Sequence, residues 1–292
     1  MKIWLVGAGY WGSKIRAALD RAGVDSDIID IRDGQSIDNI TTRDPVMLAT
    51  PLWQHHDQCL TLLERGHDIY VEKPMAETVE QIQELKQTAR SHQIVMVGHI
   101  FQHHPQRQEI KTLINTGFIG TLQHITSRRL NWGIYQTKTD PVLSLATHDI
   151  SIIQDFCDQD MQITAVSRHH LTANLQPDKV TFSGMAGSVS FMVDVSWCWP
   201  VRTRETVFIG SEGQIVWDQD ANVYRMSRHR IENNRAITDI DAQTVRYKSD
   251  LSPLDHEVRH WVNCLKHRQQ PSTSFTSALS VAMVIDQISH WR

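Results

Sequence analysis

A short apolar run, residues 3–6, leads directly into three glycines spaced as Gly-x-Gly-x-x-Gly, and apolar residues then recur at helical spacing. Gly7 permits a tight turn from strand to helix, Gly9 lets a pyrophosphate approach the backbone, and Gly12 lets the helix pack on the strand. The first turn of the helix offers free N–H groups and a positive dipole end to phosphates. The pattern predicts a dinucleotide-binding strand, loop and helix.

An acidic residue stands at the end of the second apolar stretch. Asp30 is placed to accept hydrogen bonds from the adenosine ribose hydroxyls, and its charge repels a 2′-phosphate, which favours NAD over NADP. Arg32 lies two residues later and softens this preference, so that NADP remains possible. Tyr10 and Trp11, inside the glycine motif, are predicted to contact the cofactor as well.

The composition excludes several other classes of protein. A chain of 292 residues is long enough for two domains, and a net charge of −4 with a pI near 6.5 gives no electrostatic basis for binding nucleic acid. Four widely spaced cysteines without a Cys-x-x-Cys pair are typical of reduced thiols. Lys2 and the apolar run after it superficially resemble a signal peptide, but the run is short and contains the phosphate loop, and no stretch reaches the length of a membrane span. We therefore expect a cytoplasmic protein that does not bind a membrane.

Strands and helices alternate over the first 120 or so residues, which predicts a doubly wound parallel sheet. Farther along, apolar and polar residues alternate over residues 189–197, the period of an antiparallel strand with one buried face. We predict a dinucleotide-binding domain over residues 1–119 and a second, mostly sheet domain over residues 120–292. A helix of the second domain is expected to begin near Thr147, and two more after Pro253.

Two segments with reactive side chains are predicted at or near the carboxyl ends of strands, where such sheets bind ligands. Residues 72–74, Glu-Lys-Pro, end a strand, and residues 147–149, Thr-His-Asp, open a helix. Together with the glycine motif, they resemble the Gfo/Idh/MocA family (glucose–fructose oxidoreductase/inositol dehydrogenase). The segments that carry this resemblance are Ala49-Thr50-Pro51 with His55, Val71-Glu72-Lys73-Pro74, Gly98-His99, Ser196-Trp197 and Gly210-x-x-Gly213.

The resemblance covers nearly the whole chain and implies a particular architecture. The N-terminal domain would be a Rossmann domain, and the C-terminal α+β domain would have an open mixed sheet whose exposed face forms homodimers or homotetramers. Further cofactor contacts implied by the resemblance are Thr50, Pro51, His55, Glu72, Lys73 and His99.

Within the family, the chain looks most like nucleotide-sugar 3-dehydrogenases, which oxidise UDP-N-acetylglucosamine derivatives. This likeness rests on residues 129–133 and 142–151. The substrate contacts that it implies are Lys73, Arg129, Asn131, Ser144, His148 and Asp149. Ser144 stands where the subgroup usually has an aspartate, and a serine hydroxyl does not carry that negative charge.

Lys73 and His148 are the predicted catalytic residues. Oxidation of an alcohol removes a hydride from carbon, which a nicotinamide accepts, and a proton from oxygen, which the protein must take. A lysine beside a cationic nicotinamide has a lowered pKa, and a histidine titrates near neutrality, so both suit proton transfer. Members of the family differ in which of the two is the base.

Two of the substrate candidates also have a structural alternative. Asp149 suits the first turn of a helix equally well, because its charge stabilises the helix dipole there. Arg128 and Arg129 are adjacent on a strand, so at most one of them points toward a substrate, and both are equally plausible as solvated side chains.

Residues 256–260, His-Glu-Val-Arg-His, match the zinc-protease pattern His-Glu-x-x-His. The apolar residues of this helix fall on one face, and the two histidines fall on the opposite side, which is expected to face solvent. No third ligand has suitable spacing. We therefore predict no metal site.

The leading hypothesis is an NAD-dependent oxidoreductase that acts on a secondary hydroxyl of a sugar or nucleotide sugar. One alternative is a dehydrogenase of a free polyol such as inositol. Another is a non-catalytic NAD(P)-binding regulator of the same fold, which Ser144 favours and the presence of both Lys73 and His148 disfavours.

Overall fold

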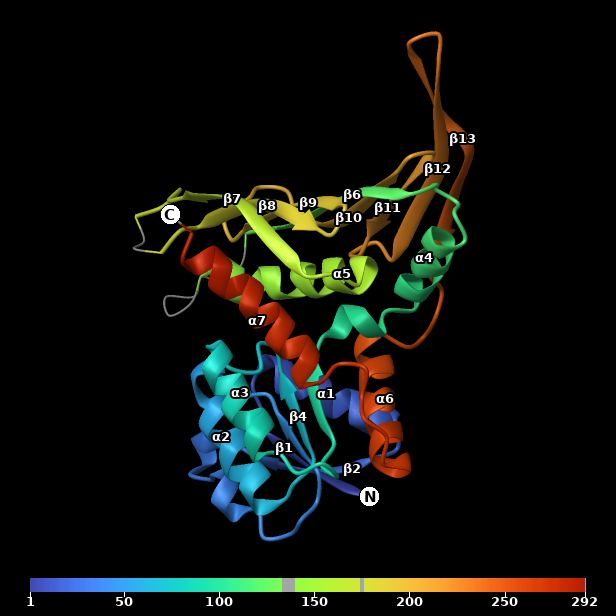
Figure 1. Ribbon diagram of the computed structural model, residues 1–292. Helices are drawn as coiled ribbons and strands as arrows, with labels where there is room; N and C mark the ends of the chain where they lie inside the picture. Colours follow the sequence, from blue (N-terminus) through green and yellow to red (C-terminus); the bar gives the residue numbers. More distant parts are fainter. Residues whose placement is uncertain (133–139, 174–175, 292) are drawn as a thin grey trace. The chain divides into compact units, whose positions relative to one another are not determined.

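The computed structural model describes residues 1–132, 140–173 and 176–291 (Figure 1). Gly133, part of the segment that resembles nucleotide-sugar dehydrogenases, lies outside these residues. The chain forms two compact units. The first comprises Met1–His103 and Asp250–Met283, and the second comprises His104–Ser249 and Val284–Arg292.

The first unit contains a parallel sheet of five strands in the order β2-β1-β3-β4-β5. Its strands are β1 (Lys2–Val6), β2 (Asp25–Ile29), β3 (Val46–Leu48), β4 (Ile69–Glu72) and β5 (Val95–Gly98). Its helices are α1 (Tyr10–Arg21), α2 (Leu52–Arg65), α3 (Val79–Thr88) and α6 (Pro253–His267), with short 3₁₀ turns at Ile31–Asp33, Ile37–Asn39 and Ile100–His103. The strand order reverses at β1, which makes the carboxyl ends of β1 and β3 the expected place for a ligand.

Alternate residues of each strand point to opposite faces of this sheet, and both faces are covered by helices (Figure 1). One face packs on α2 and α3 through Val6, Leu48, Val71 and Val97. The other packs on α1 and α6 through Leu5, Met47, Tyr70 and Met96. This two-sided burial explains why the strands are continuous apolar runs. In the sequence, Thr78 with Gln81 three residues later predicts a capping box, and the reciprocal hydrogen bonds of these two residues start α3.

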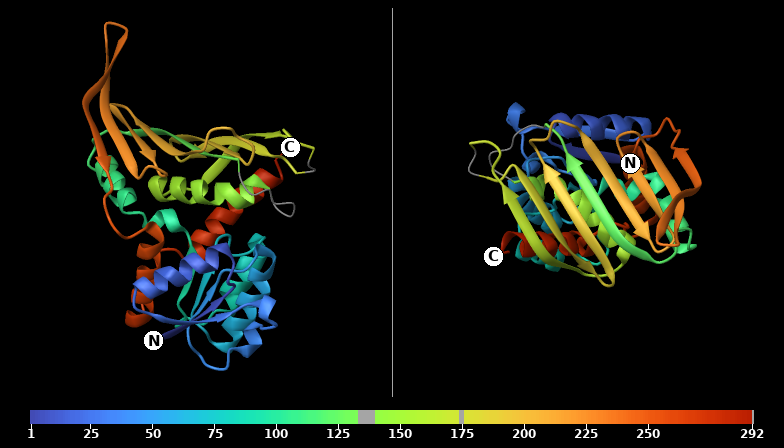
Figure 2. Two further views of the ribbon diagram at one scale, coloured as in Figure 1. Left: turned by 180° about the vertical axis from the view of Figure 1, so that it is seen from behind. Right: turned by 90° about the horizontal axis from the view of Figure 1, so that it is seen from above.

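The second unit is built on a mixed sheet of eight strands in the order β13-β12-β11-β10-β6-β9-β8-β7, drawn from above in Figure 2. Only β6 and β9 pair in parallel among the described strands of this sheet. The strands are β6 (Leu122–Leu130), β7 (Met161–His169), β8 (Lys179–Ala186), β9 (Val189–Ser196), β10 (Thr203–Gly210), β11 (Gly213–Asp218), β12 (Val223–Glu232) and β13 (Arg235–Arg246). The helices are α4 (Pro105–Asn115) and α5 (Thr147–Cys157), the latter preceded by a π-helical turn at Val142–Ala146. The last helix, α7 (Phe275–Ser289), is divided between the two units.

The predicted fold class is confirmed: a Rossmann-type parallel sheet and a larger mixed sheet with helices. The division of the chain differs from the predicted boundary between residues 119 and 120. Helix α6 lies in the first unit because its apolar face, which includes Val258 and Trp261, completes the core on the α1 side of the parallel sheet. Among the described residues, none of the helices combines the length and the apolar composition that crossing a bilayer requires.

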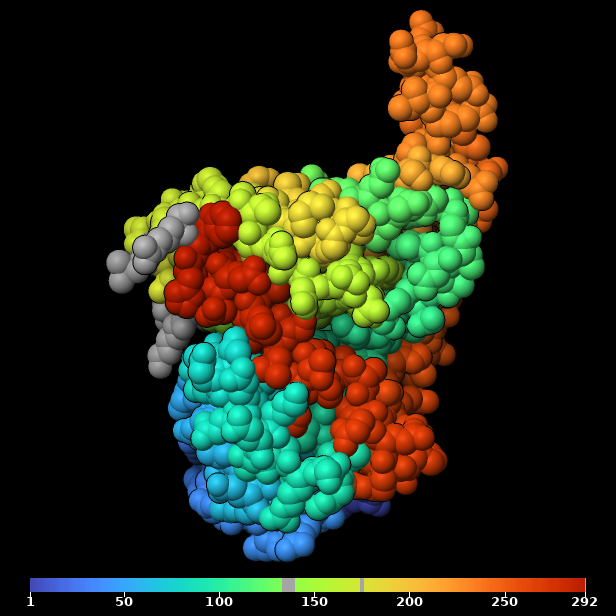
Figure 3. All heavy atoms as spheres, viewed as in Figure 1, coloured from blue at the N-terminus to red at the C-terminus, as the bar shows by residue number. Residues whose placement is uncertain are grey.

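The sequence also predicts strands over residues 163–168, 206–209, 214–217 and 223–226, which fall in β7, β10, β11 and β12, but it does not predict β8 or β13. Strand β13 is almost entirely exposed, so it has no alternation of buried and exposed residues to detect. Figure 3 shows the hairpin of β12 and β13 reaching past the neighbouring strands of its own sheet, which accounts for that exposure.

Candidate functional site

The glycine loop between β1 and α1 has the geometry that the sequence predicted. Gly7 has φ +99, and a Cβ there would lie 2.6 Å from the carbonyl oxygen of Ala49. A Cβ on Gly12 would clash with the carbonyl of Gly7, so the helix lies directly against the strand end. By contrast, apart from Gly9 itself and its two neighbours in the chain, no described residue has an atom within 4 Å of a Cβ built on Gly9. The loop is therefore closed on the sides of Gly7 and Gly12 and open at Gly9, where a pyrophosphate needs room.

A cavity of about 590 Å³ lies in front of this loop, entirely within the first unit. Eight of the predicted cofactor residues line it: Gly7, Gly9, Tyr10, Trp11, Asp30, Arg32, Thr50 and Pro51. Trp53 also lines it and was missed by the sequence analysis, although 57% of it is exposed in the first turn of α2. A dinucleotide therefore fits here: the loop offers backbone N–H groups, and aromatic side chains flank the cavity.

Asp30 is held by the backbone and by Arg32. Its two carboxylate oxygens accept from the N–H groups of Ala8 (2.8 Å) and Arg32 (2.9 Å) and from the Arg32 guanidinium at 2.8 and 2.6 Å. The Arg32 hydrogen bonds hold the pKa of this buried carboxyl well below its usual range. The aspartate thus stands ionised at the end of β2, but its charge is paired with an exposed arginine beside the cavity.

We expect this ion pair to set the choice between NAD and NADP. In Asp30→Ala, Arg32 loses its partner and becomes available to a 2′-phosphate, so the ratio of the NADP to the NAD dissociation constant should fall about tenfold or more. In the matched variant Arg32→Ala, the uncompensated Asp30 should raise that ratio. Titration by intrinsic tryptophan fluorescence measures both. An unchanged ratio in the two variants would mean that the pair does not face the adenosine ribose.

The carboxyl ends of β3 and β4 are joined through His55. Its two ring nitrogens lie 2.9 Å from the carbonyl oxygen of Thr50 and 2.8 Å from that of Pro74. Burial lowers the pKa of His55, and a neutral imidazole donates to one of these two oxygens. His55 therefore braces the loop that contains Lys73, whose peptide bond to Pro74 is cis. Its predicted contact with the cofactor stays a prediction.

Glu72, the last residue of β4, is buried in a polar network. It accepts from the indole N–H of Trp11, and the hydroxyl of Tyr70 lies 2.9 Å from its Oε1 atom. The same hydroxyl lies 3.1 Å from Oε2 of Glu257, on α6. Burial raises the pKa of Glu72 to about 7 despite these contacts and the nearby charge of Lys73. The network therefore extends from Trp11 at the cofactor cavity, through Glu72 and Tyr70 on β4, to Glu257 on α6.

His99 follows the end of β5 and is 1% exposed. Neither of its ring nitrogens has a hydrogen-bond partner in the part of the chain that the structure describes. Burial, with a contribution from the charge of Lys73, lowers the pKa of His99 to about 3, so its ring is neutral. A buried imidazole without partners is a candidate contact for a bound polar group.

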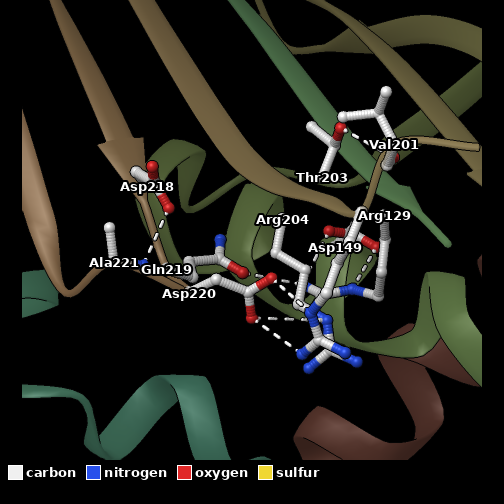
Figure 4. A network of polar contacts seen from close by, with 10 residues as sticks. Arg129, Asp149, Val201, Thr203, Arg204, Asp218, Gln219, Asp220 and Ala221 are labelled. Atoms are coloured by element: carbon white, nitrogen blue, oxygen red, sulfur yellow. Dashed lines mark hydrogen bonds and ion pairs between the residues drawn. The ribbon is translucent and has the colours of Figure 1, made fainter.

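In the second unit, Arg129 and Asp149 pair with each other (Figure 4). Two guanidinium nitrogens lie 2.9 and 3.0 Å from the carboxylate, and both side chains are almost completely buried. Asp149 also accepts from the hydroxyl of Ser127, and Arg129 donates to Gln219. The pair fastens α5 to β6. Both residues were predicted to contact a substrate; that role stays a prediction.

Three other predicted substrate residues, Asn131, Ser144 and His148, lie at the end of β6 or near the start of α5. The hydroxyl of Ser144 lies in the π-helical turn and accepts from the indole N–H of Trp197 at 3.1 Å. His148 is half-buried in the first turn of α5. The side-chain oxygen of Asn131 is buried and has no hydrogen-bond partner among the described residues. Lys73 belongs to the first unit and His148 to the second, so their cooperation remains a proposal.

The His-Glu-x-x-His segment on α6 differs from its prediction in one respect. His256 and His260 were expected on a solvent face, but both are half-buried, and His260 contacts Ser272 and His103. His260 accepts from the backbone N–H of Ser272 at 3.2 Å. The described residues contain no group of three or more His, Cys, Asp or Glu side chains placed to hold a metal ion.

The parallel sheet, the glycine loop and the carboxylate after β2 define a dinucleotide-binding oxidoreductase domain. Residues 17–99 match the NAD-binding Rossmann fold of the oxidoreductase family GFO_IDH_MocA. The resemblance predicted from the sequence is thereby confirmed: residues 17–99, within the first unit, match the NAD-binding Rossmann fold of this oxidoreductase family.

Curated relatives share parts of the chain. A 2,7-anhydro-N-acetylneuraminate hydratase from Mediterraneibacter gnavus is 27% identical over 146 residues, 44% of this chain and 39% of that protein. An inositol 2-dehydrogenase from Rhodococcus jostii is 24% identical over 240 residues, 76% of this chain and 64% of that protein. The chain thus spans less than two thirds of the length of each relative.

Solved structures share the whole fold. A UDP-N-acetylglucosamine 3-dehydrogenase from Acidithiobacillus ferrooxidans superposes with a TM-score of 0.83 at 15% identity, covering 99% of this chain and 96% of that chain. At this level of identity the likeness concerns the fold, including the second unit, which the family model does not reach.

Proposed function

We propose that this protein is an NAD-dependent dehydrogenase that oxidises a secondary hydroxyl of a sugar or nucleotide sugar. The observation that carries the proposal is Lys73, which follows the last residue of β4 in the unit that holds the dinucleotide cavity. A lysine at that end of a parallel strand is suited to reach a substrate bound beside the nicotinamide. The sugar dehydrogenases among the similar proteins support the substrate class.

Different residues of the chain bind the cofactor, accept the proton and orient the substrate. Bound NAD supplies the hydride acceptor. The backbone N–H groups after Gly9 hold the pyrophosphate, and Asp30 receives the ribose hydroxyls. The neutral amine of Lys73, or the imidazole of His148, takes the proton that leaves the substrate hydroxyl. The side chain of Asn131, with a buried oxygen that lacks a partner among the described residues, is a candidate to orient the sugar.

The finer substrate assignment is a nucleotide sugar of the UDP-N-acetylglucosamine type. The resemblance of residues 142–151 to nucleotide-sugar 3-dehydrogenases supports it, and the fold likeness to such an enzyme agrees. A free polyol such as inositol is the alternative substrate, since an inositol 2-dehydrogenase is the relative that aligns over 76% of the chain. We also propose a cytoplasmic homodimer or homotetramer that assembles through the exposed face of the eight-stranded sheet.

One observation favours a second function. Ser144 replaces the usual aspartate, and its hydroxyl already accepts from Trp197. A protein that binds NAD without turning over a sugar would tolerate this change, so a cofactor-binding regulator is the competing proposal.

A panel of UDP-sugars and free polyols, each mixed with NAD and the protein, separates the two functions. We expect NADH to form with at least one member of the panel. Binding of NAD without formation of NADH from any UDP-sugar or polyol would favour the regulator.

A further inference from the structure

The buried carboxyl of Glu257 belongs to a sequence motif that the proposed reaction does not use. Glu257 is 0% exposed, and its Oε2 atom contacts the hydroxyl of Tyr70 at 3.1 Å. Tyr70, also 0% exposed, contacts Oε1 of Glu72 at 2.9 Å. Two carboxyl groups from α6 and β4 therefore meet at one phenolic hydroxyl inside the first unit.

Counting hydrogens shows that this arrangement requires an additional proton. A tyrosine hydroxyl has one hydrogen to donate and otherwise accepts. If both carboxyls were ionised, one of the two contacts with Tyr70 would bring lone pairs together with no hydrogen between them. A protonated carboxyl removes the conflict, because it donates to the hydroxyl of Tyr70, which then donates to the other carboxyl.

The surroundings of the two carboxyls indicate which one is protonated. Glu72 also accepts from the indole N–H of Trp11, so a negative charge on it is stabilised by two donors. The Oε1 atom of Glu257 is buried and has no hydrogen-bond partner among the described residues. If Glu257 is protonated, this atom is a neutral carbonyl oxygen. Burying a neutral carbonyl oxygen without a partner costs far less free energy than burying a charged carboxylate oxygen in the same way.

We propose that Glu257 is a positioning residue that stays protonated and donates to Tyr70, so that Tyr70 donates to Glu72 and Glu72 remains the one negative charge of the network. Glu72 then holds Trp11 at the wall of the cofactor cavity and lies next to Lys73 in the chain. Only the effect of this network on catalysis rests on the proposed dehydrogenase function; the position of the proton does not.

Electrostatics agree with the geometry. Burial, together with the charge of Glu72, raises the pKa of Glu257 well above its ordinary value, whereas the pKa of Glu72 is raised to about 7. The titratable groups that act on Glu257 are Glu72 and Tyr70, both from β4. Lys73 acts on Glu72, and the contact from α1, Trp11, does not titrate.

Infrared difference spectra test where the proton lies. At about pH 8.5, above the pKa of about 7 of Glu72, the protein should show the C=O band of a buried protonated carboxyl, sensitive to exchange into D₂O. That band should disappear in Glu257→Gln and persist in the control Glu64→Gln, which changes an exposed glutamate. A band that persists in Glu257→Gln would place the proton on Glu72, and absence of the band in the unchanged protein would mean that both groups are ionised. Either result overturns the proposal.

Thermal stability gives a second readout that needs no activity. Because the pKa of Glu257 is raised on folding, the folded protein binds more protons than the unfolded one, and stability falls as pH rises above the ordinary glutamate pKa. Glutamine does not titrate. The Tm of Glu257→Gln minus the Tm of the unchanged protein should therefore increase by about 3 °C or more between about pH 5 and about pH 8. A Tm difference that does not change with pH would contradict the proposal.

The pH dependence of kcat/KM tests the positioning role. Glutamine still donates to Tyr70. In Glu257→Gln the acidic limb of the kcat/KM profile should therefore lie within a few tenths of a pH unit of its position in the unchanged protein. Glu257→Leu removes the donor and should move that limb upward by about half a unit or more, because Glu72 becomes harder to ionise. Identical limbs in both variants would refute the positioning role. If the protein has no dehydrogenase activity, the infrared and thermal results still decide where the proton lies.

Discussion

Replacing Lys73 with alanine is expected to lower kcat about 10²- to 10⁴-fold, the usual contribution of one general acid or base. The affinity for NAD should change little, because the dinucleotide cavity is lined by Gly7, Asp30 and Arg32, among others, and not by Lys73. Steady-state kinetics with the substrate found in the panel, and a fluorescence titration with NAD, measure the two effects separately.

The control is Lys86→Ala, which removes an exposed lysine from α3 of the same unit. This variant should keep the kcat of the unchanged protein. A Lys73→Ala variant with a near-normal kcat would assign the proton transfer to another group, of which His148 is the first candidate.

The second large effect concerns the stability of the second unit. Asp149→Asn leaves the guanidinium of Arg129 buried without its carboxylate, and breaking a buried ion pair in this way costs about 3–5 kcal/mol. The Tm should fall by on the order of 10 °C. Asp220→Asn is the matched control: it breaks a pair with Arg202 that is far more exposed, worth at most about 1 kcal/mol.

Thermal denaturation of both variants, with kcat/KM measured well below the transition, distinguishes the two roles of Asp149. A structural role predicts a lower Tm with largely retained activity. A Tm near that of the unchanged protein, combined with a loss of activity, would instead support the substrate contact that the family resemblance implies.

The parts of the fold that could be predicted are those with a strong local pattern. The Gly-x-Gly-x-x-Gly loop, the capping box at Thr78 and the alternation over residues 189–197 each gave the correct element. Helix α6 was predicted as a helix, but its membership in the first unit depends on contacts with α1 across more than 230 residues of chain, as in the Arg21–Asp255 ion pair. An amphipathic pattern shows that a helix has a buried face, not which core that face completes.

For the candidate site too, residues within a contiguous motif could be predicted, whereas contacts between distant parts of the chain could not. The residues of the glycine loop and Asp30 were found because one contiguous motif specifies them. Glu257 was noticed only as part of a metal-site pattern and set aside. Its contact with Tyr70 joins residues 187 positions apart, and the pairing of Arg129 with Asp149 likewise depends on how α5 lies on its sheet. Such tertiary pairs leave no trace in the spacing of a single sequence.

The most direct test of the central claim is the fate of a hydrogen on the substrate. UDP-N-acetylglucosamine and inositol, each deuterated at the ring carbons, are incubated with the protein and NAD, and the mass of the reduced cofactor is measured. If the protein is a sugar or polyol dehydrogenase, NADH formed with one of the two compounds carries one deuterium from the ring, and Lys73→Ala forms almost none. NADH without deuterium, or bound NAD that neither compound reduces, would contradict the central claim.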